Sequence, residues 1–142
     1  MTVPMAQFEL PIRIYWEDTD AGGIVFYANY LKFFERARTE WLRALGFGQQ
    51  QLREESAGMF VVTEASTRYL RPARLDDELI ITARLERAGR ASLVLAQQAL
   101  LRTAARAEDA LLCDARVHIG WVDSRSLRPA RIPSTILDRV DS

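Results

Sequence analysis

One long helix pattern among strand patterns is the feature that most restricts how this chain folds. Over residues 30–45, apolar side chains recur at the spacing of a single helix face: Tyr30, Phe33, Phe34, Ala37, Trp41, Ala44 and Leu45. The opposite face carries the charged side chains Lys32, Glu35, Arg36, Arg38, Glu40 and Arg43. Gly46 follows, where helices commonly end in the left-handed conformation. The pattern predicts a helix of about 25 Å with one face to bury.

The remaining patterns are those of strands. Residues 8–16 are rich in Ile, Tyr and Trp and predict a short strand. Four later runs alternate, and each is expected to turn one set of side chains to a common face: Met59, Val61, Thr63, Ala65, Thr67 and Tyr69; Leu79, Ile81, Ala83 and Leu85; Leu93, Leu95, Gln97, Ala99 and Leu101; and Leu111, Cys113, Ala115, Val117, Ile119 and Trp121. Residues 132–140 predict a final helical turn. Because short turns favour an antiparallel meander, we expect an α+β fold in which a curved sheet of about five strands covers the helix.

Length and charge limit the setting and the partners. The 142 residues fit one domain, residues 1–142. The 19 basic and 19 acidic side chains leave no net charge to attract nucleic acid or an anionic membrane. The chain does not start with a secretory signal, and no run approaches the ~18 apolar residues of a membrane span. We therefore expect a cytoplasmic protein with no integral membrane segment and no nucleic-acid partner.

Metal and thiol chemistry are not favoured by this sequence. A single cysteine and a single histidine cannot supply a usual zinc ligand set, so no metal site is expected. Cys113 and His118 are five residues apart on an expected strand and therefore face opposite sides. We interpret Cys113 as a small buried hydrophobic side chain and His118 as structural.

The acidic turn ahead of the helix is the best candidate for chemistry. Residues 17–23 place Asp18, Asp20, Gly22 and Gly23 just before the helix. The first N–H groups of a helix lack intrahelical acceptors, so they can polarise a carbonyl that a nearby carboxylate attacks, or toward which it activates water. This arrangement suits acyl transfer, and a thioester is the least demanding substrate because its thiol departs as thiolate. The alternative is that Asp18 and Asp20 only cap the helix or close the turn.

A longer motif surrounds this turn. Residues 15–43 read YWEDTDAGGIVFYANYLKFFERARTEWLR, and this run resembles the signature of the hotdog-fold acyl-CoA thioesterases. The likeness is greatest to the Tol-Pal-associated YbgC branch, with the 4-hydroxybenzoyl-CoA thioesterases as near relatives, and it continues through RPARLDD at residues 71–77 and Asp123. The resemblance implies a hotdog fold and hydrolysis of acyl-CoA without a cofactor. It also implies a homo-oligomer, dimer or tetramer, with active sites at the dimer interface.

The resemblance assigns roles to individual residues. Asp20 matches the second Asp of the family's D-x-D-x-x-G motif, and its carboxylate would either attack the thioester carbonyl or activate water. The backbone N–H of Tyr27, at the helix-start position, would polarise the carbonyl. Gly22 and Gly23 would let the chain approach the substrate closely.

The CoA phosphates are expected to meet basic residues near the dimer interface. The candidates lie around Gly89: Arg87, Arg90 and Ser92. The alternative is that these residues form a solvated rim.

The sequence departs from the family pattern at two positions, and two rival functions stay open. Many YbgC-type members have His where this chain has Tyr27 and Tyr where it has Trp16, so no imidazole can belong to this site. One rival is a hotdog dehydratase or hydratase, which normally needs an imidazole near its acid. The other is a non-catalytic module that uses the same groove to bind an acyl carrier protein or a Tol-Pal-linked envelope partner.

Overall fold

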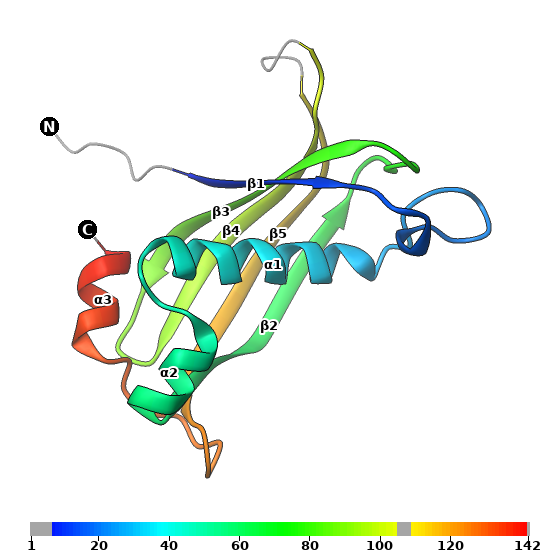
Figure 1. The fold of residues 1–142 in the computed structure, drawn as a ribbon. Helices are drawn as coiled ribbons and strands as arrows, with labels where there is room; N and C mark the ends of the chain where they lie inside the picture. Colours follow the sequence, from blue (N-terminus) through cyan, green and yellow to red (C-terminus); the bar gives the residue numbers. More distant parts are fainter. Residues whose placement is uncertain (1–6, 105–108, 142) are drawn as a thin grey trace, which may run out of the picture.

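The structure is a computed structural model that describes residues 7–104 and 109–141, and it places one sheet against one long helix (Figure 1). In chain order the elements are β1 (Phe8–Arg13), the 3₁₀ turn η1 (Trp16–Asp18), α1 (Asn29–Ala44), α2 (Gln49–Ser56), β2 (Gly58–Tyr69), β3 (Glu78–Ala88), β4 (Ser92–Leu101), β5 (Ala110–Asp123) and α3 (Ser134–Val140). The strands pair antiparallel in the order β1-β3-β4-β5-β2. The expected α+β hotdog arrangement is confirmed. None of the helices in the described ranges has the length and apolar character needed to cross a membrane.

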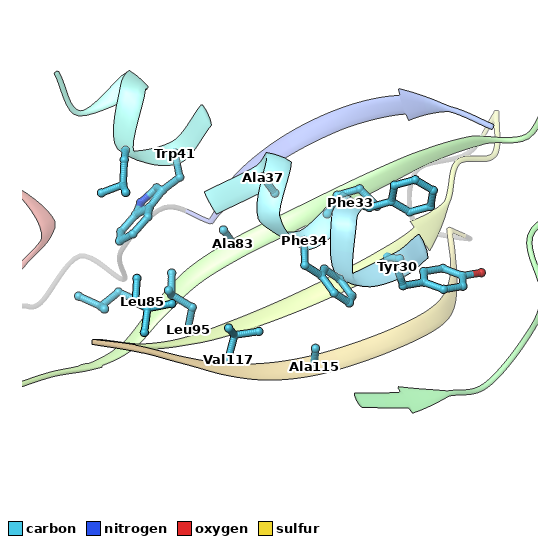
Figure 2. Close-up of a cluster of buried hydrophobic side chains, with 14 of the residues drawn as sticks. Tyr30, Phe33, Phe34, Ala37, Trp41, Ala83, Leu85, Leu95, Ala115 and Val117 are labelled. Atoms are coloured by element: carbon cyan, nitrogen blue, oxygen red, sulfur yellow. The ribbon is translucent and has the colours of Figure 1, made fainter. Parts of the chain in front are cut away.

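The apolar face of α1 packs against the sheet as predicted. Phe33, Phe34 and Ala37 are buried almost completely, and Figure 2 shows Phe34 reaching from the helix toward the strands. Burying an aromatic side chain of this size contributes about 2–3 kcal/mol. The helix also ends where predicted, because Gly46 has φ 101° and the N–H of Phe47 donates to a carbonyl in the last turn, at 2.8 Å.

Two predictions for α1 are wrong. Ala44, the last residue of the helix, is exposed rather than buried. Arg38, expected on the charged face, is only 8% exposed. It follows Phe34 by four residues and so shares its face, and its Nη1 donates to Oε1 of Gln97 on β4 at 3.0 Å. A polar partner that is distant in sequence therefore accounts for the buried charge.

The strand faces are confirmed for β3 and β4 and partly wrong for β5 and β2. The predicted sets on β3 and β4 belong to the hydrophobic core or pack against it, with Gln97 buried among them, and so does the β5 set from Cys113 onward. At the start of β5 the register shifts, and Leu112 rather than Leu111 is in the core. On β2 the register shifts between Val62 and Glu64. Such a bulge inserts one residue and reverses which side chains face inward. Phe60 therefore faces the core and packs on Trp121, whereas Met59 lies on the other face, away from the helix.

Differences also occur at two other elements. The strand predicted over residues 8–16 ends at Arg13, because the carboxylate of Asp18 accepts the Tyr15 N–H and closes the η1 turn. α2 was not expected, and its sequence is polar with only Leu52 buried, so it lacks an apolar stripe. The final helical turn is confirmed as α3.

Candidate active site

The loop of residues 14–28 joins β1 to α1 and is folded by its own aspartates. Asp18 Oδ2 accepts the backbone N–H of Tyr15 at 2.8 Å, and the carbonyl of Asp18 accepts the N–H of Phe26 at 3.0 Å. The side chain of Asn29, the first residue of α1, donates to the same carbonyl at 2.9 Å. Asp18 therefore has a structural role, since it ties the start of the loop to the start of the helix.

Asp20 lies at the exposed tip of this loop. Its Oδ1 accepts the N–H of Gly22 at 2.8 Å, and its own N–H donates to the carbonyl of Ile24 at 2.9 Å. No other group among the described residues donates to this carboxylate, so one of its oxygens is free. Gly23 has φ 79°, a conformation that favours glycine, and a Cβ on Gly22 would make a tight contact of 3.2 Å with Asp20 Oδ1.

The segment of residues 71–77, between β2 and β3, holds the loop from the other side. The N–H of Val25 donates to the carbonyl of Ala73 at 2.9 Å, and Ile24 forms a bridge with Arg74. Val25 is 5% exposed and Ala73 is fully buried, so this contact anchors the loop in the core. The RPARLDD segment noted in the sequence thus supports the acidic turn.

The start of α1 leaves the backbone donors of Tyr27 and Ala28 without acceptors among the described residues. The N–H groups of Asn29, Tyr30 and Leu31 donate to carbonyls three residues earlier. The N–H of Tyr27 has no acceptor in the part of the chain that the structure describes. The side chain of Tyr27 is 62% exposed, and its N–H lies at the positive end of the helix dipole. This group can stabilise a developing oxyanion.

Two of the hollows that border this loop include the candidate catalytic residues. The first, of about 440 Å³, is bordered by Trp16, Thr19, Asp20, Ala21, Gly23 and Leu75. The second, of about 210 Å³, is bordered by Ile24, Val25, Tyr27, Tyr30, Tyr69, Leu70, Arg71 and Pro72. Asp20 thus borders one hollow, and Tyr27, whose N–H has no acceptor among the described residues, borders the other.

One chain does not bring the predicted phosphate-binding residues to this loop. Arg87, Arg90 and Ser92 lie at the β3–β4 hairpin, which Figure 1 shows near α3 at the opposite end of the sheet. Arg87 borders a separate hollow of about 430 Å³ together with Arg116 and His118. A site that uses both groups needs a second chain.

The two residues set aside in the sequence lie where their patterns predicted. Cys113 is fully buried, and burial raises the pKa of its thiol to about 12, so it stays protonated. His118 lies on the other face of β5, with Nε2 3.9 Å from Glu64. Sequence reasoning missed Asn29, whose side chain holds the helix start; an Asn directly before an apolar helix pattern is the signal that could have identified it.

Comparison with known proteins gives consistent similarities over most of the chain. Residues 14–140 match the thioesterase-like superfamily. The acyl-CoA thioester hydrolase YbgC of Escherichia coli is 42% identical over 130 residues, which cover 92% of each chain. A probable thioesterase from Bartonella henselae superposes with a TM-score of 0.82 at 33% identity, over 90% of this chain and 100% of that one. A 4-hydroxybenzoyl-CoA thioesterase in complex with 4-hydroxybenzoyl-CoA shares the fold, with a TM-score of 0.86 at 20% identity over 94% of this chain and 98% of the other.

Proposed function

This chain belongs to the thioesterase-like superfamily and is an acyl-CoA thioester hydrolase, and we propose that the loop between β1 and α1 carries its chemistry. One observation supports this proposal above the others. A carboxylate with a free oxygen, on Asp20, and a backbone N–H without an acceptor, on Tyr27, occur on one loop that is anchored at both ends. These are the two tools that acyl transfer needs.

The Asp20 carboxylate can act by two routes. As a nucleophile, its free oxygen attacks the thioester carbonyl carbon, CoA leaves as thiolate, and water hydrolyses the mixed anhydride to the free acid. As a general base, it takes a proton from water while the water oxygen attacks, and that proton passes to the departing thiolate. On both routes the Tyr27 N–H donates to the carbonyl oxygen as negative charge develops, which is worth about 100-fold or more in kcat for one donor.

A second copy of the chain is proposed to complete the site. β1, at one edge of the sheet, is short and carries Pro11 and the charged Arg13, which discourage pairing. β2, at the other edge, has 12 residues, and the half-exposed side chains Val62 and Tyr69 lie along it. Antiparallel pairing of two β2 edges reverses the second chain, so its residues 87–92 hairpin would lie at the end of the sheet that holds Asp20.

The finer assignments rest on the resemblance to the YbgC branch. We propose that residues 1–142 act as one domain and that the protein is cytoplasmic. An acyl carrier protein or a Tol-Pal-linked protein is the proposed further partner. The homo-oligomer is proposed as a dimer or tetramer built on the β2 edge.

Replacing Asp20 by Asn tests the mechanism. We expect Asp20→Asn to lower kcat by about 100-fold or more, equivalent to about 2.7 kcal/mol of transition-state stabilisation. The melting temperature should change little, because the Asn side-chain oxygen can still accept the Gly22 N–H. The measurement is release of free thiol from a panel of acyl-CoA and aryl-CoA thioesters, together with thermal unfolding.

Two outcomes would contradict the proposal. If Asp20→Asn unfolds several degrees earlier and keeps its turnover, Asp20 only closes the turn. If the unaltered protein binds acyl-CoA tightly but releases no thiol, the chain is the non-catalytic binding module.

A further inference from the structure

Tyr30, the second residue of α1, carries a buried hydroxyl that has no hydrogen-bond partner of normal geometry among the described residues. Its side chain is 3% exposed, and among the described residues its oxygen is the only buried side-chain nitrogen or oxygen without a hydrogen-bond partner. Burial raises the pKa of Tyr30 to about 12, so the hydroxyl keeps its proton. The amide of Ala73 opposes this rise without reaching hydrogen-bond geometry.

Stability alone does not explain this hydroxyl. A buried, unsatisfied polar group costs about 1–3 kcal/mol, and such groups in folded proteins call for an explanation. Less than 1 Å² of the oxygen is accessible, so no water fits against it in this conformation. Phenylalanine would pack in the same place without the cost.

Tyr30 lies beside the smaller of the two active-site hollows. Tyr30 borders this hollow, and Figure 2 shows its oxygen at the outer end of the α1 aromatic cluster. The ring of Tyr69 packs edge-on against the rings of Tyr30 and Tyr27, with centroids 5.8 Å apart in both pairs. Tyr69 is 44% exposed, so its ring is not enclosed by packing on every side.

The hollow also has the size and position for an acyl group. Its volume of about 210 Å³ compares with the ~150 Å³ cavity that holds benzene in another protein, so one ring or a short chain fits. Tyr27 borders the same hollow and supplies the proposed oxyanion donor. A thioester carbonyl at the Tyr27 N–H can therefore extend its acyl group toward Tyr30.

We propose that this hollow receives the acyl group and that the Tyr30 hydroxyl donates a hydrogen bond to an oxygen on it once Tyr69 turns aside. The preferred substrates are then thioesters of short acyl groups that carry a carbonyl or hydroxyl oxygen. A site with a buried polar group discriminates strongly against an analogue that leaves this group unpaired. This inference rests on the proposed function, because it assigns the acyl subsite of the same loop.

Matched substrate pairs test the inference. The pairs are butanoyl-CoA with 3-oxobutanoyl-CoA, and benzoyl-CoA with 4-hydroxybenzoyl-CoA. In at least one pair we expect the unaltered protein to prefer the oxygenated member about ten-fold or more in kcat/KM. Tyr30→Phe should abolish that preference while changing kcat/KM for the hydrocarbon member less than about two-fold. Its melting temperature should be no lower, because the deleted hydroxyl makes no hydrogen bond of normal geometry with the described residues of the free protein.

A matched control removes another tyrosine hydroxyl. Tyr15→Phe deletes one from a side chain that is 64% exposed and borders neither active-site hollow, so the substrate preference should persist. Absence of a preference in both pairs, or an equal loss on both members in Tyr30→Phe, would overturn the inference.

The failure of the inference can be told apart from failure of the proposed function. If thiol release depends on Asp20 but Tyr30→Phe keeps the preference, the function stands and the acyl subsite lies elsewhere. Binding gives a second reading, independent of turnover. The Asp20→Asn variant should bind the oxygenated member more tightly, and adding Tyr30→Phe should remove that difference; an unchanged difference would overturn the assignment.

Discussion

The packed layer of α1 on the sheet and the loop of residues 14–28 adjoin in space but are stabilised in different ways. In the layer, side chains such as Phe34 and Leu95 are fully buried, and stability comes mainly from apolar surface removed from water. In the loop, Trp16 is 79% exposed and Tyr27 is 62% exposed. Its shape depends instead on backbone groups that bond to Asp18 and to the turn at Asp20.

The difference shows how free polar groups can be held in place. Two buried residues of the loop flank its tip, Ile14 at 0% and Val25 at 5% exposure. The tip between them stays in water, so the Asp20 carboxylate keeps an oxygen without a donor at no desolvation cost. We therefore expect changes in the layer to lower stability, and changes at the loop tip to lower turnover.

The largest effect is expected for Phe34→Ala in the layer. The deleted ring leaves a cavity between α1 and the sheet, and we expect the free energy of unfolding to fall by about 3–5 kcal/mol. Urea unfolding gives this value, and thiol release from the folded fraction should stay within about ten-fold. Leu31→Ala on the same helix is the control, because Leu31 is 44% exposed; a similar loss there would show that helix propensity, rather than packing, sets the stability.

A smaller loss is expected for Gln97→Leu. Gln97 is fully buried, accepts from Arg38, and donates to the carbonyls of Phe34 and Thr82 at 3.1 Å each. Leucine fills the space but leaves the buried guanidinium without its acceptor, which should cost about 2 kcal/mol by urea unfolding.

Two further variants check this interpretation of Gln97. The side chain of Gln98 points to the other face of β4 from Gln97. We therefore expect Gln98→Leu to lower the free energy of unfolding by less than about 1 kcal/mol. Adding Arg38→Met to Gln97→Leu should restore part of the lost stability, because it removes the unpaired charge. If the double variant is less stable than Gln97→Leu alone, the hydrogen bond is not what stabilises this pair.

Local patterns in the sequence predicted most of the layer. The spacing of Phe33, Phe34 and Ala37, the glycine at position 46 and the alternation in β3 to β5 are all set by nearby residues. The burial of Arg38 was missed because its acceptor is 59 residues away. The β2 bulge after Val62 has no local signature, since a one-residue shift depends on pairing with β5.

The loop was predictable in its chemistry but not in its anchoring. Two aspartates and two glycines indicate a turn with available carboxylates. The contact of Val25 with Ala73 joins residues 48 positions apart and follows only from the folded sheet. The same holds for Tyr30, whose spacing indicates a core residue and gives no sign that its hydroxyl is unsatisfied.

The smallest effect is expected for Asp18→Asn, and it sharpens the comparison within the loop itself. Asp18 and Asp20 are two residues apart, but only the Asp18 carboxylate accepts the Tyr15 N–H. The backbone carbonyl of Asp18 also accepts a hydrogen bond from the side chain of Asn29, at the start of α1. An Asn oxygen can still accept that N–H, so we expect a loss below about 1 kcal/mol and a change in kcat of about three-fold at most. Measuring kcat and thermal unfolding for Asp18→Asn beside Asp20→Asn separates charge from shape. Both variants lose one negative charge, but only Asp20 borders the larger active-site hollow. If both substitutions lower turnover equally, the Asp20 carboxylate has no special role, and the fold of the loop governs hydrolysis.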